Sequence, residues 1–353
     1  MNRFTLPLLC LCATTGFAGT IELVAGTGRP GDSGDGGPAS HAQLKMPFFL
    51  DFNRAGNLLI ADTENSRVRV VDLKSGVIST LPGVNGAPIG FQPFALAVDA
   101  NDDLYLVDRL GARVVKRDGK SGVVSVLAGT GKKAYAGDGG PASEASMIEP
   151  HDACLDGRGG LLVADVADWR IRRVDLKTGV ISTFAGIGRP RSRPTRDAKG
   201  DGGPAAKAVV MGARAVCVDG LGNTYICERE GGTVRKVDSA GVITTFAGTG
   251  QKGYTGDGGD ALSASFNGPK GVRCDHDGNL FVLDTENHAV RKIDARTHVI
   301  ATVAGGRRGT AGLGGEATQA GLNRPHGCLA ARDGTLYIAD TDNHRVLRVG
   351  PNP

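Results

Sequence analysis

The sequence predicts an all-β protein made of six repeated units, each with four antiparallel strands. One reason is that a similar string recurs far apart in the chain, as ADTENSRVRVVD at 61–72, LDTENHAVRKID at 283–294 and ADTDNHRVLRV at 339–349. A second reason is composition, because glycine supplies 55 of the 353 residues while aromatic residues supply only 5%. Such a composition favours many short strands joined by tight turns, with small aliphatic side chains in the core.

The first 18 residues have the features of a cleaved export signal. Arg3 supplies a positive charge, an apolar stretch covers 4–13, and Gly16 and Ala18 are the small residues that a signal peptidase requires. The apolar stretch is too short to span a bilayer as a helix, so we expect no membrane insertion. We therefore predict a signal peptide at 1–18, a single domain at 19–353, and a secreted or periplasmic location.

The unit boundaries follow from a landmark residue that stands a constant distance before a glycine-containing turn. Examples of the turn are RAGNL at 54–58 and HDGNL at 276–280, and ANDDL at 100–104 is a weaker copy. Consecutive landmarks are 46 to 63 residues apart and lie at Pro47, Pro93, Pro150, Ala213, Pro269 and Pro325. Self-similarity at this spacing indicates stacked units that share one continuous core.

Each unit contains four predicted strands in a fixed order. An apolar strand follows the landmark, and the second strand is apolar and ends in an acid, as at 58–62. The third strand alternates basic and apolar residues, as at 67–71, which is the two-residue period of a strand. The fourth reads like GVISTLPG at 76–83. Four antiparallel strands in each repeat describe the blade of a β-propeller.

The two ends of the chain complete each other. The sixth unit stops after its third strand, whereas the segment TIELVAG from Thr20 resembles the missing fourth strand. We expect this segment to pair with the last blade and close the ring, because closure removes an unpaired sheet edge.

The pattern Asp-Thr-x-Asn-His-x-Val, at 284–290 and 340–346, resembles the NHL repeat family. The Gly-Asp-Gly-Gly-Pro-Ala segments between units are similar to those of bacterial secreted NHL proteins and of the NHL domain of teneurins. This resemblance implies a six-bladed propeller. It does not imply one activity, because the family includes scaffolds, ligand-binding domains and enzymes.

A candidate ligand site lies at the start of the first strands, which are innermost in a propeller. One side of the channel mouth would be aromatic and the other basic, a combination that could hold an anionic ligand with an apolar part. Filling of the channel by these side chains is the alternative interpretation. Binding should strengthen below about pH 6.5 if the two histidines gain charge. The six mouth residues, each directly after a landmark, are Phe48, Phe94, His151, Arg214, Lys270 and His326.

Two sets of acids also recur. The first set ends the second strands, where we expect backbone N–H groups of the next turn to be their partners. The second set lies in Gly-Asp-Gly-Gly segments between units, where turn formation competes with calcium binding, and calcium needs six to eight oxygen ligands. The first set is Asp62, Asp108, Asp165, Glu228, Asp284 and Asp340. The second set is Asp35, Asp138, Asp201 and Asp257.

Metal and thiol chemistry have weak sequence support. The resemblance extends to an amidating lyase that binds zinc through channel histidines, but in this sequence only His151 and His326 match, and Arg214 and Lys270 would repel a cation. We therefore expect no cofactor and keep a divalent cation as a minor alternative. Five cysteines remain after the signal, with no CxxC spacing, and Cys217 could face Cys227 across a hairpin. These five are Cys154, Cys217, Cys227, Cys274 and Cys328.

The function that the sequence favours is that of an exported binding or scaffold module. Its partner would be a protein, a glycan or a small anionic ligand, held at the channel mouth and on the face with the long inter-blade loops. The alternative is a hydrolase or lyase of lactonase or amidating-lyase type at the central channel, so catalysis stays open. The net charge of +4 with interspersed signs gives no reason to expect nucleic acid binding.

Overall fold

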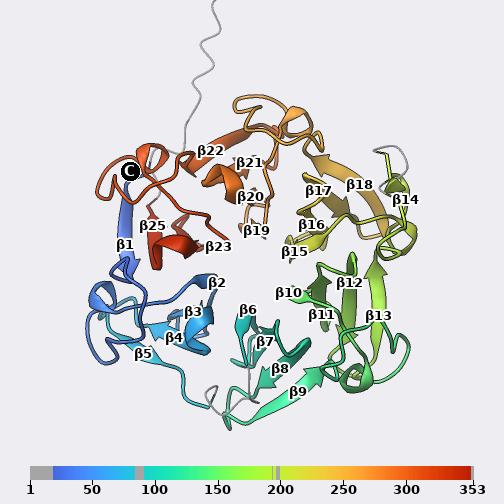
Figure 1. Ribbon diagram of the computed structural model, residues 1–353, viewed down its shortest axis with the longest axis horizontal. Helices are drawn as coiled ribbons and strands as arrows, with labels where there is room; N and C mark the ends of the chain where they lie inside the picture. The colour runs from blue at the N-terminus through green and yellow to red at the C-terminus, as the bar shows by residue number, and fades with distance from the viewer. Residues whose placement is uncertain (1–18, 84–90, 193, 196–198, 351–353) are drawn as a thin grey trace, which may run out of the picture.

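The computed structural model describes residues 19–83, 91–192, 194–195 and 199–350. Within them, six sheets stand around a central axis (Figure 1). The predicted six-bladed, all-β propeller is therefore confirmed. The predicted signal peptide at 1–18 and the last three residues, 351–353, lie outside the described residues.

Each blade has four antiparallel strands, which follow one another from the channel outwards. Blades one to three consist of β2 (Pro47–Phe52), β3 (Leu58–Asp62), β4 (Arg67–Val71) and β5 (Ile78–Thr80); β6 (Pro93–Val98), β7 (Leu104–Asp108), β8 (Arg113–Arg117) and β9 (Val124–Ala128); and β10 (Pro150–Leu155), β11 (Gly160–Asp165), β12 (Arg170–Asp175) and β13 (Ile181–Ala185). Blades four to six consist of β15 (Ala213–Val218), β16 (Thr224–Glu228), β17 (Thr233–Val237) and β18 (Val242–Ala247); β19 (Gly271–Cys274), β20 (Leu280–Asp284), β21 (Ala289–Ile293) and β22 (Ile300–Gly305); and β23 (Gly327–Ala330), β24 (Leu336–Asp340), β25 (Arg345–Val349) and β1 (Ile21–Ala25).

The turn between the first and second strands explains why one copy of the repeat is weak. In blade one, Gly56 has a φ of 80°, a conformation that costs glycine little and most other residues much more. Blade two has Asp102 with a φ of 62° at its turn. Aspartate is among the few non-glycine residues that adopt this conformation, so ANDDL forms a turn without the glycine.

The ring is closed by the N-terminal strand, as predicted. β1 pairs antiparallel with β25, with Ile21 opposite Val349 and Leu23 opposite Leu347. In Figure 1 the blue β1 lies beside the red strands of blade six. Hydrophobic packing continues across the junction to blade one, because Leu50 of β2 belongs to the same buried cluster as residues of β24 and β25.

In blades one, five and six, the recurring Asp-Thr-x-Asn string, followed by His in blades five and six, joins the blade to the next one. The Thr285 hydroxyl donates a hydrogen bond to the Pro325 carbonyl of blade six at 2.8 Å, and His288 Nδ1 accepts one from the Arg324 backbone N–H at 3.1 Å. These contacts give the histidine a structural role and explain why the string recurs. The equivalent threonine contacts are Thr63 to Pro93 and Thr341 to Pro47, both at 2.7 Å.

The long segments before blades one, three, four, five and six, which we call spacers, cover the outer edges of the blades. Each contains a short 3-10 helix and pairs briefly with the outermost strand, as Pro38 does with Val77. In blade four this pairing is a two-residue strand, β14 (Gly203–Pro204), on β18. The spacer helices are η1 (Ala39–His41), η4 (Ala142–Glu144), η6 (Ala205–Lys207), η7 (Ala261–Ser263) and η9 (Ala317–Gln319), and further helices after second strands are η2 (Thr63–Asn65), η8 (Thr285–Asn287) and η10 (Thr341–Asn343).

The channel is filled below its mouth. Asp152 of β10, fully buried, forms two hydrogen bonds of 2.8 Å with the Arg273 guanidinium of β19 on the other side of the channel. The same guanidinium lies 4.9 Å from the ring centre of Phe49. Gly271 and Gly327 let neighbouring strands approach, since an added Cβ would lie 2.4 Å from the His326 carbonyl oxygen and 2.2 Å from that of Phe48 respectively. Side chains and close backbone contacts therefore occupy the ring interior next to the mouth.

Candidate functional site at the channel mouth

The six mouth residues lie around one cavity, because each directly follows the landmark at the start of a first strand. The cavity has a volume of about 300 Å³. The six side chains are at most 7% exposed, and all of them line it. Aromatic contact runs along one side: the Phe48 ring centre lies 4.2 Å from that of Phe94 and 4.5 Å from that of His326, and Phe94 lies 4.6 Å from His151.

His151 and His326 are neutral hydrogen-bond acceptors at this site. His151 Nδ1 lies 3.0 Å from the Glu149 carbonyl oxygen, and His326 Nδ1 lies 2.8 Å from that of Arg324. A carbonyl oxygen only accepts, so Nδ1 carries the proton in both rings. Nε2 of His326 then has a lone pair, whereas Nε2 of His151 lies 3.6 Å from a carboxylate oxygen of Glu149. Burial and the charge of Arg214 lower the pKa of both rings well below the usual value. The expectation that binding strengthens below about pH 6.5 is therefore wrong, because neither ring gains its proton there.

Arg214 is a buried cation without an anionic partner in the part of the chain that the structure describes. No described residue forms an ion pair or a side-chain hydrogen bond with it, and its Nε is buried and unpaired. Its guanidinium carbon lies 5.0 Å from the Phe94 ring centre. Burial, followed by the charge of Arg229, lowers the pKa of Arg214 to about 9. The charge of Glu149 acts to raise this pKa, but no described carboxylate lies within ion-pair distance of the guanidinium, which is costly in a buried position.

Lys270 has a partner, unlike Arg214. Its Nζ lies 2.6 Å from a carboxylate oxygen of Glu286, which also binds Arg324 at 3.0 Å. Burial lowers the pKa of Lys270 to about 8, although Glu286 acts to raise it. Lys270 therefore supplies positive charge at neutral pH and loses it in mildly alkaline solution.

The rim of the cavity carries charges that the sequence interpretation missed. Arg109 pairs with Glu149 at 3.1 Å, whereas no described residue pairs with the exposed side chain of Arg229. These rim residues either follow the acid of a second strand or precede a landmark. Their position in the repeat is the signal that could have identified them, since the end of each second strand and the start of each first strand meet at the mouth. The cavity is lined by five basic and two acidic residues: Arg109, Arg214, Arg229, Lys270 and Arg324, with Glu64 and Glu149.

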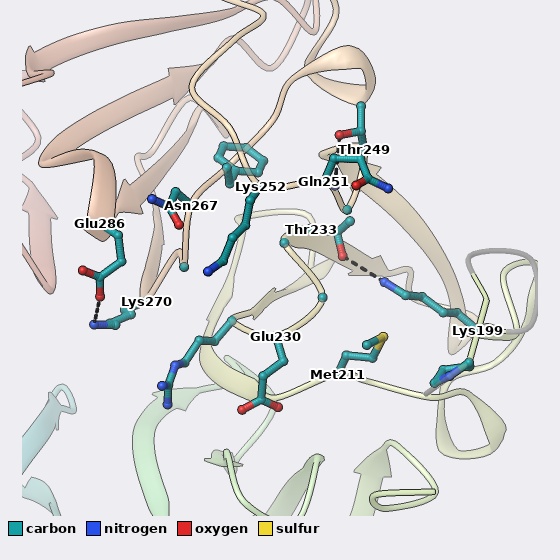
Figure 2. A pocket seen from close by; sticks show the side chains of 17 residues that line it. Lys199, Met211, Glu230, Thr233, Thr249, Gln251, Lys252, Asn267, Lys270 and Glu286 are labelled. Carbon is teal, nitrogen blue, oxygen red and sulfur yellow. Dashed lines mark hydrogen bonds and ion pairs between the residues drawn. The ribbon is translucent and has the colours of Figure 1, made fainter. Parts of the chain in front are cut away.

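A larger groove of about 1040 Å³ leads away from the mouth between blades four and five (Figure 2). Arg229 and Lys270 line both the groove and the mouth cavity, so the two are continuous. Its other side chains are largely polar, and Figure 2 shows Lys252 and Gln251 above the groove with Glu230 opposite. The sequence interpretation did not find this groove, because its walls come from loops of two blades.

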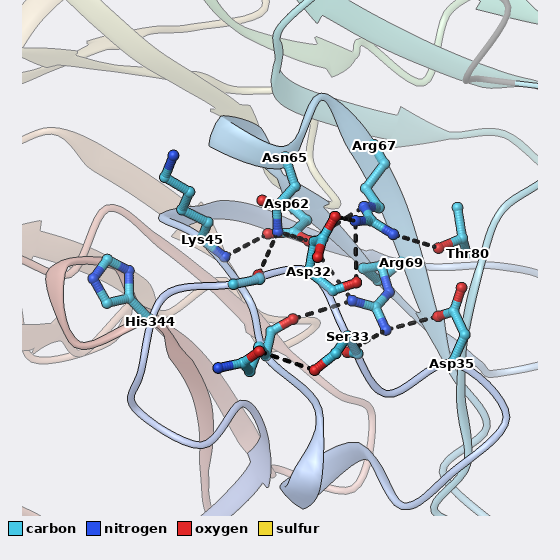
Figure 3. Close-up of polar contacts among 12 residues, drawn as sticks. Asp32, Ser33, Asp35, Lys45, Asp62, Asn65, Arg67, Arg69, Thr80 and His344 are labelled. Carbon is cyan, nitrogen blue, oxygen red and sulfur yellow. Dashed lines mark hydrogen bonds and ion pairs between the residues drawn. The ribbon is translucent and has the colours of Figure 1, made fainter.

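The Gly-Asp-Gly-Gly acids pair with arginines of the third strands. Asp35 lies 2.7 Å from Arg69 of β4, and Asp257 lies 2.6 Å from Arg291 of β21 (Figure 3 shows the first pair). Burial would raise the pKa of Asp35, but a hydrogen bond from Thr80 and the charge of Arg69 lower it below the usual value. The remaining pairs of this type are Asp138 with Arg172 and Asp201 with Arg235. Across the described ranges, no three His, Cys, Asp or Glu side chains gather as a metal site.

The acids that end the second strands are structural, as predicted, but their main partners differ from the prediction. Asp62 accepts the Lys45 backbone N–H at 2.7 Å, and Asp284 accepts that of Asn267 at 2.7 Å. These partners lie at the end of the preceding spacer. The predicted bonds from the next turn occur in two blades, where Asp108 accepts the Gly111 N–H at 3.1 Å and Asp165 accepts the Asp168 N–H at 3.3 Å. Each acid thus fixes the segment that leads into the innermost strand of its own blade, and so positions the mouth residue.

The cysteines do not pair across the predicted hairpin. Cys217 stands opposite Tyr225, and Cys227 stands opposite Ala215. The two cysteines lie on the same face of the sheet but are two positions out of register, and the Cys217–Cys227 bridge is not formed. All five described cysteines are free thiols.

Comparison with known proteins shows that the chain is similar to NHL repeat proteins and teneurins. The chain is 26% identical over 338 residues to SUPPRESSOR OF QUENCHING 1 of Arabidopsis thaliana, which covers 92% of this chain and 27% of that one. It is 25% identical over 318 residues to NHL repeat-containing protein 2 of Bos taurus, with 82% and 37% covered. Teneurin-3 of Danio rerio is 28% identical over 225 residues, which are 54% of this chain and 8% of that one.

This chain is a six-bladed β-propeller that is similar in sequence to NHL repeat proteins. No family model matches it. The chain spans only between 27% and 37% of the length of the first curated relatives that it matches.

Solved structures share the fold of this propeller at low sequence identity. A protein of unknown function from Bacteroides thetaiotaomicron has a TM-score of 0.71 at 18% identity, covering 95% of this chain and 76% of that one. An auxiliary nutrient binding protein from Bacteroides ovatus has a TM-score of 0.69 at 14% identity, with 96% and 78% covered. Virginiamycin B lyase from Staphylococcus aureus has a TM-score of 0.54 at 12% identity, with 87% and 96% covered. Among the described residues, no helix has the length and apolar character required to cross a bilayer.

Proposed function

We propose that the protein is an exported binding module that holds a small carboxylate at its channel mouth. The observation that carries the proposal is Arg214, which is 5% exposed and has no counter-ion among the described residues. A buried guanidinium is costly unless a ligand supplies the missing charge. Its planar donors match a carboxylate, and Lys270 adds a second positive charge on the same cavity.

The neutral histidines restrict the chemistry of the ligand further. With Nδ1 bound to a carbonyl oxygen, His326 offers only the Nε2 lone pair to a ligand. A lone pair is satisfied by a hydroxyl donor and not by another anion. A carboxylate that also carries hydroxyl groups, such as an aldonic or uronic acid, would satisfy both Arg214 and His326. Phe48 and Phe94 would contact its carbon skeleton.

The groove between blades four and five extends the proposal to longer ligands. The mouth cavity of about 300 Å³ is large enough for one small acid, while the adjoining groove of about 1040 Å³ is large enough for several further units. Lys252 and Arg229 supply positive charge along it, and no described residue pairs with either side chain. An acidic oligosaccharide with its terminal acid in the mouth is the ligand class that this arrangement favours.

Export and a role in binding have separate support. The export signal predicted at 1–18 agrees with a secreted or periplasmic location. Two structural neighbours from Bacteroides are described as auxiliary nutrient binding proteins. Both proposals remain to be tested on this chain.

The test is a binding screen with a matched pair of variants. Thermal shift and calorimetry would use citrate, gluconate, galacturonate and digalacturonate with wild type, Arg214→Met and the control Arg54→Met. Arg54 is an exposed arginine in the first hairpin turn of blade one, at the opposite end of the strands. Loss of the Arg214 contact should weaken binding by about 1.5–3 kcal/mol, or about ten- to a hundredfold. Equal affinities in wild type and Arg214→Met would refute the site.

A second candidate function, lactone hydrolysis or a lyase reaction at the mouth, is favoured by one observation. His326 lines the cavity with Nδ1 bound to a carbonyl oxygen, so its Nε2 can accept a proton from a water molecule, although burial lowers its pKa and makes it a weak base. If this function is correct, wild type should turn over aldonolactones, and His326→Gln should lose turnover while it keeps affinity for gluconate. Binding without turnover would leave the module purely a receptor.

A further inference from the structure

Two thiols from neighbouring blades meet beneath the mouth. Cys217 Sγ of β15 lies 3.1 Å from Cys274 Sγ of β19. That separation is shorter than the distance of about 3.5–4.0 Å at which non-bonded carbon atoms pack. Formation of a disulfide, with sulfur atoms about 2 Å apart, needs an approach of only about 1 Å.

The surroundings select this pair over the alternatives. Cys227 is out of register with Cys217 and fully buried. Cys154 packs in the same hydrophobic cluster as Cys217, but its thiol donates a hydrogen bond to the Leu155 carbonyl at 3.3 Å. Cys328 is fully buried in a different cluster. Cys274 is partly exposed, so a reagent can reach it, while Cys217 is 3% exposed and lies directly behind it.

We propose that Cys217 and Cys274 form an interblade disulfide when the protein meets a disulfide oxidant, either a small molecule or an oxidising protein. The Cys274 thiolate attacks the exogenous disulfide, forms a mixed disulfide and releases one thiol. The Cys217 thiolate then attacks the Cys274 sulfur and releases the second thiol. Two protein thiols are oxidised, one exogenous disulfide is reduced to two thiols, and the two cysteine protons pass to the released thiolates.

The bond would join two blades that have no shared sheet. β15 and β19 belong to separate sheets, and the bridge would join cysteines that are 57 positions apart in the chain. A loop of this length loses much conformational entropy in the unfolded chain when it is closed, so the oxidised protein should be more stable. The bond would also fix β15, which carries Arg214, against β19, which directly follows Lys270.

The experiment is peptide mapping without reduction. The full chain, purified in reduced form, is treated with glutathione disulfide, its remaining thiols are alkylated, and it is digested with trypsin. We expect a linked pair of the peptides 215–229 and 274–291, with a combined mass lower by two hydrogen atoms. Because Cys217 and Cys227 share the first peptide, the link should survive in Cys227→Ala and Cys154→Ala and should be absent in Cys217→Ala and Cys274→Ala.

Stability provides an independent readout. Reduction should lower the Tm of the oxidised wild type by several °C, and it should leave the Tm of Cys217→Ala unchanged. Full alkylation of every thiol in the oxidant-treated wild type would overturn the proposal, as would a link that involves Cys154 or Cys227. None of these measurements uses a ligand, so the outcome is independent of the proposed anion site.

Discussion

Arg214 is the residue at which stability and binding should oppose each other. A buried cation without a partner is destabilising, and an apolar side chain of similar size is often neutral or stabilising in its place. We therefore expect Arg214→Met, without ligand, to have an unchanged Tm or one raised by a few °C. Thermal unfolding checks this, with Arg69→Met as the contrast, because Arg69 is paired with Asp35 and its loss should lower the Tm. A drop in the Tm of Arg214→Met similar to that of Arg69→Met would show that Arg214 is structural.

Lys270 should make ligand binding sensitive to alkaline pH. Its pKa is about 8, so the charged form dominates at pH 7 and is lost as the pH rises through this value. Carboxylates remain ionised throughout, so affinity for gluconate should fall by a few fold between pH 7 and pH 8.5. Titration calorimetry at several pH values measures the change, and Lys270→Gln should bind more weakly with a flat profile over the same range. A flat wild-type profile would contradict the role of Lys270.

The environment of each mouth residue was harder to predict than its position. The positions of the six mouth residues could be predicted, because the landmark fixes them within the repeat. The absence of a partner for Arg214 could not be predicted. The pairing of Lys270 with Glu286 could not be predicted either, because Lys270 precedes the first strand of the blade whereas Glu286 follows the second. The low pKa of His326 depends on burial and on Arg214 from another blade, and no local pattern encodes it.

At the scale of the element, the spacer is held by an aspartate–arginine pair with a sequence signature. The partners are 34 residues apart in each of four blades, as Asp257 and Arg291 are. The fifth spacer has Leu313 in place of the aspartate, and 34 residues later Leu347 replaces the arginine. The matched replacement could have indicated the pair from sequence alone, whereas a reading of each spacer by itself suggested only turns or calcium.

A double-mutant cycle tests this pair. Asp257→Leu leaves the fully buried Arg291 with only carbonyl partners and a distant contact to Asp284, and should cost about 2–3 kcal/mol of unfolding free energy. Asp257→Leu with Arg291→Leu, which copies blade six, should recover at least about 1 kcal/mol of that loss. Denaturant unfolding supplies both values. Strictly additive effects would show that the two side chains do not act as a pair.

At the scale of the whole molecule, the closure of the ring depends on β1. Removal of residues 1–25 would leave the edge of β25 unpaired and uncover a cluster that contains Ile21. We expect this truncation to lower the Tm by more than about 10 °C or to cause self-association, as seen by size-exclusion chromatography. The control begins at Gly19 and should behave as wild type. A peptide of residues 19–26 added in trans should partly restore stability; a truncated protein as stable as the control would contradict closure by β1.

The fold was predictable from sequence because every blade repeats the same strand order and turn chemistry. Blade count and ring closure followed from six landmarks and from one displaced strand, TIELVAG, at the start of the chain. The filled channel was not predictable, because Asp152 and Arg273 meet across the axis from blades three and five. The groove between blades four and five depends in the same way on how two separate loops stand in space.

The most direct test of the carboxylate site is a crystal structure of the wild-type protein soaked with gluconate. We predict a carboxylate within about 3 Å of the Arg214 guanidinium and a hydroxyl within hydrogen-bonding distance of His326 Nε2. Gluconate bound only at another surface, with Arg214 contacting nothing but water at a saturating concentration, would contradict the site.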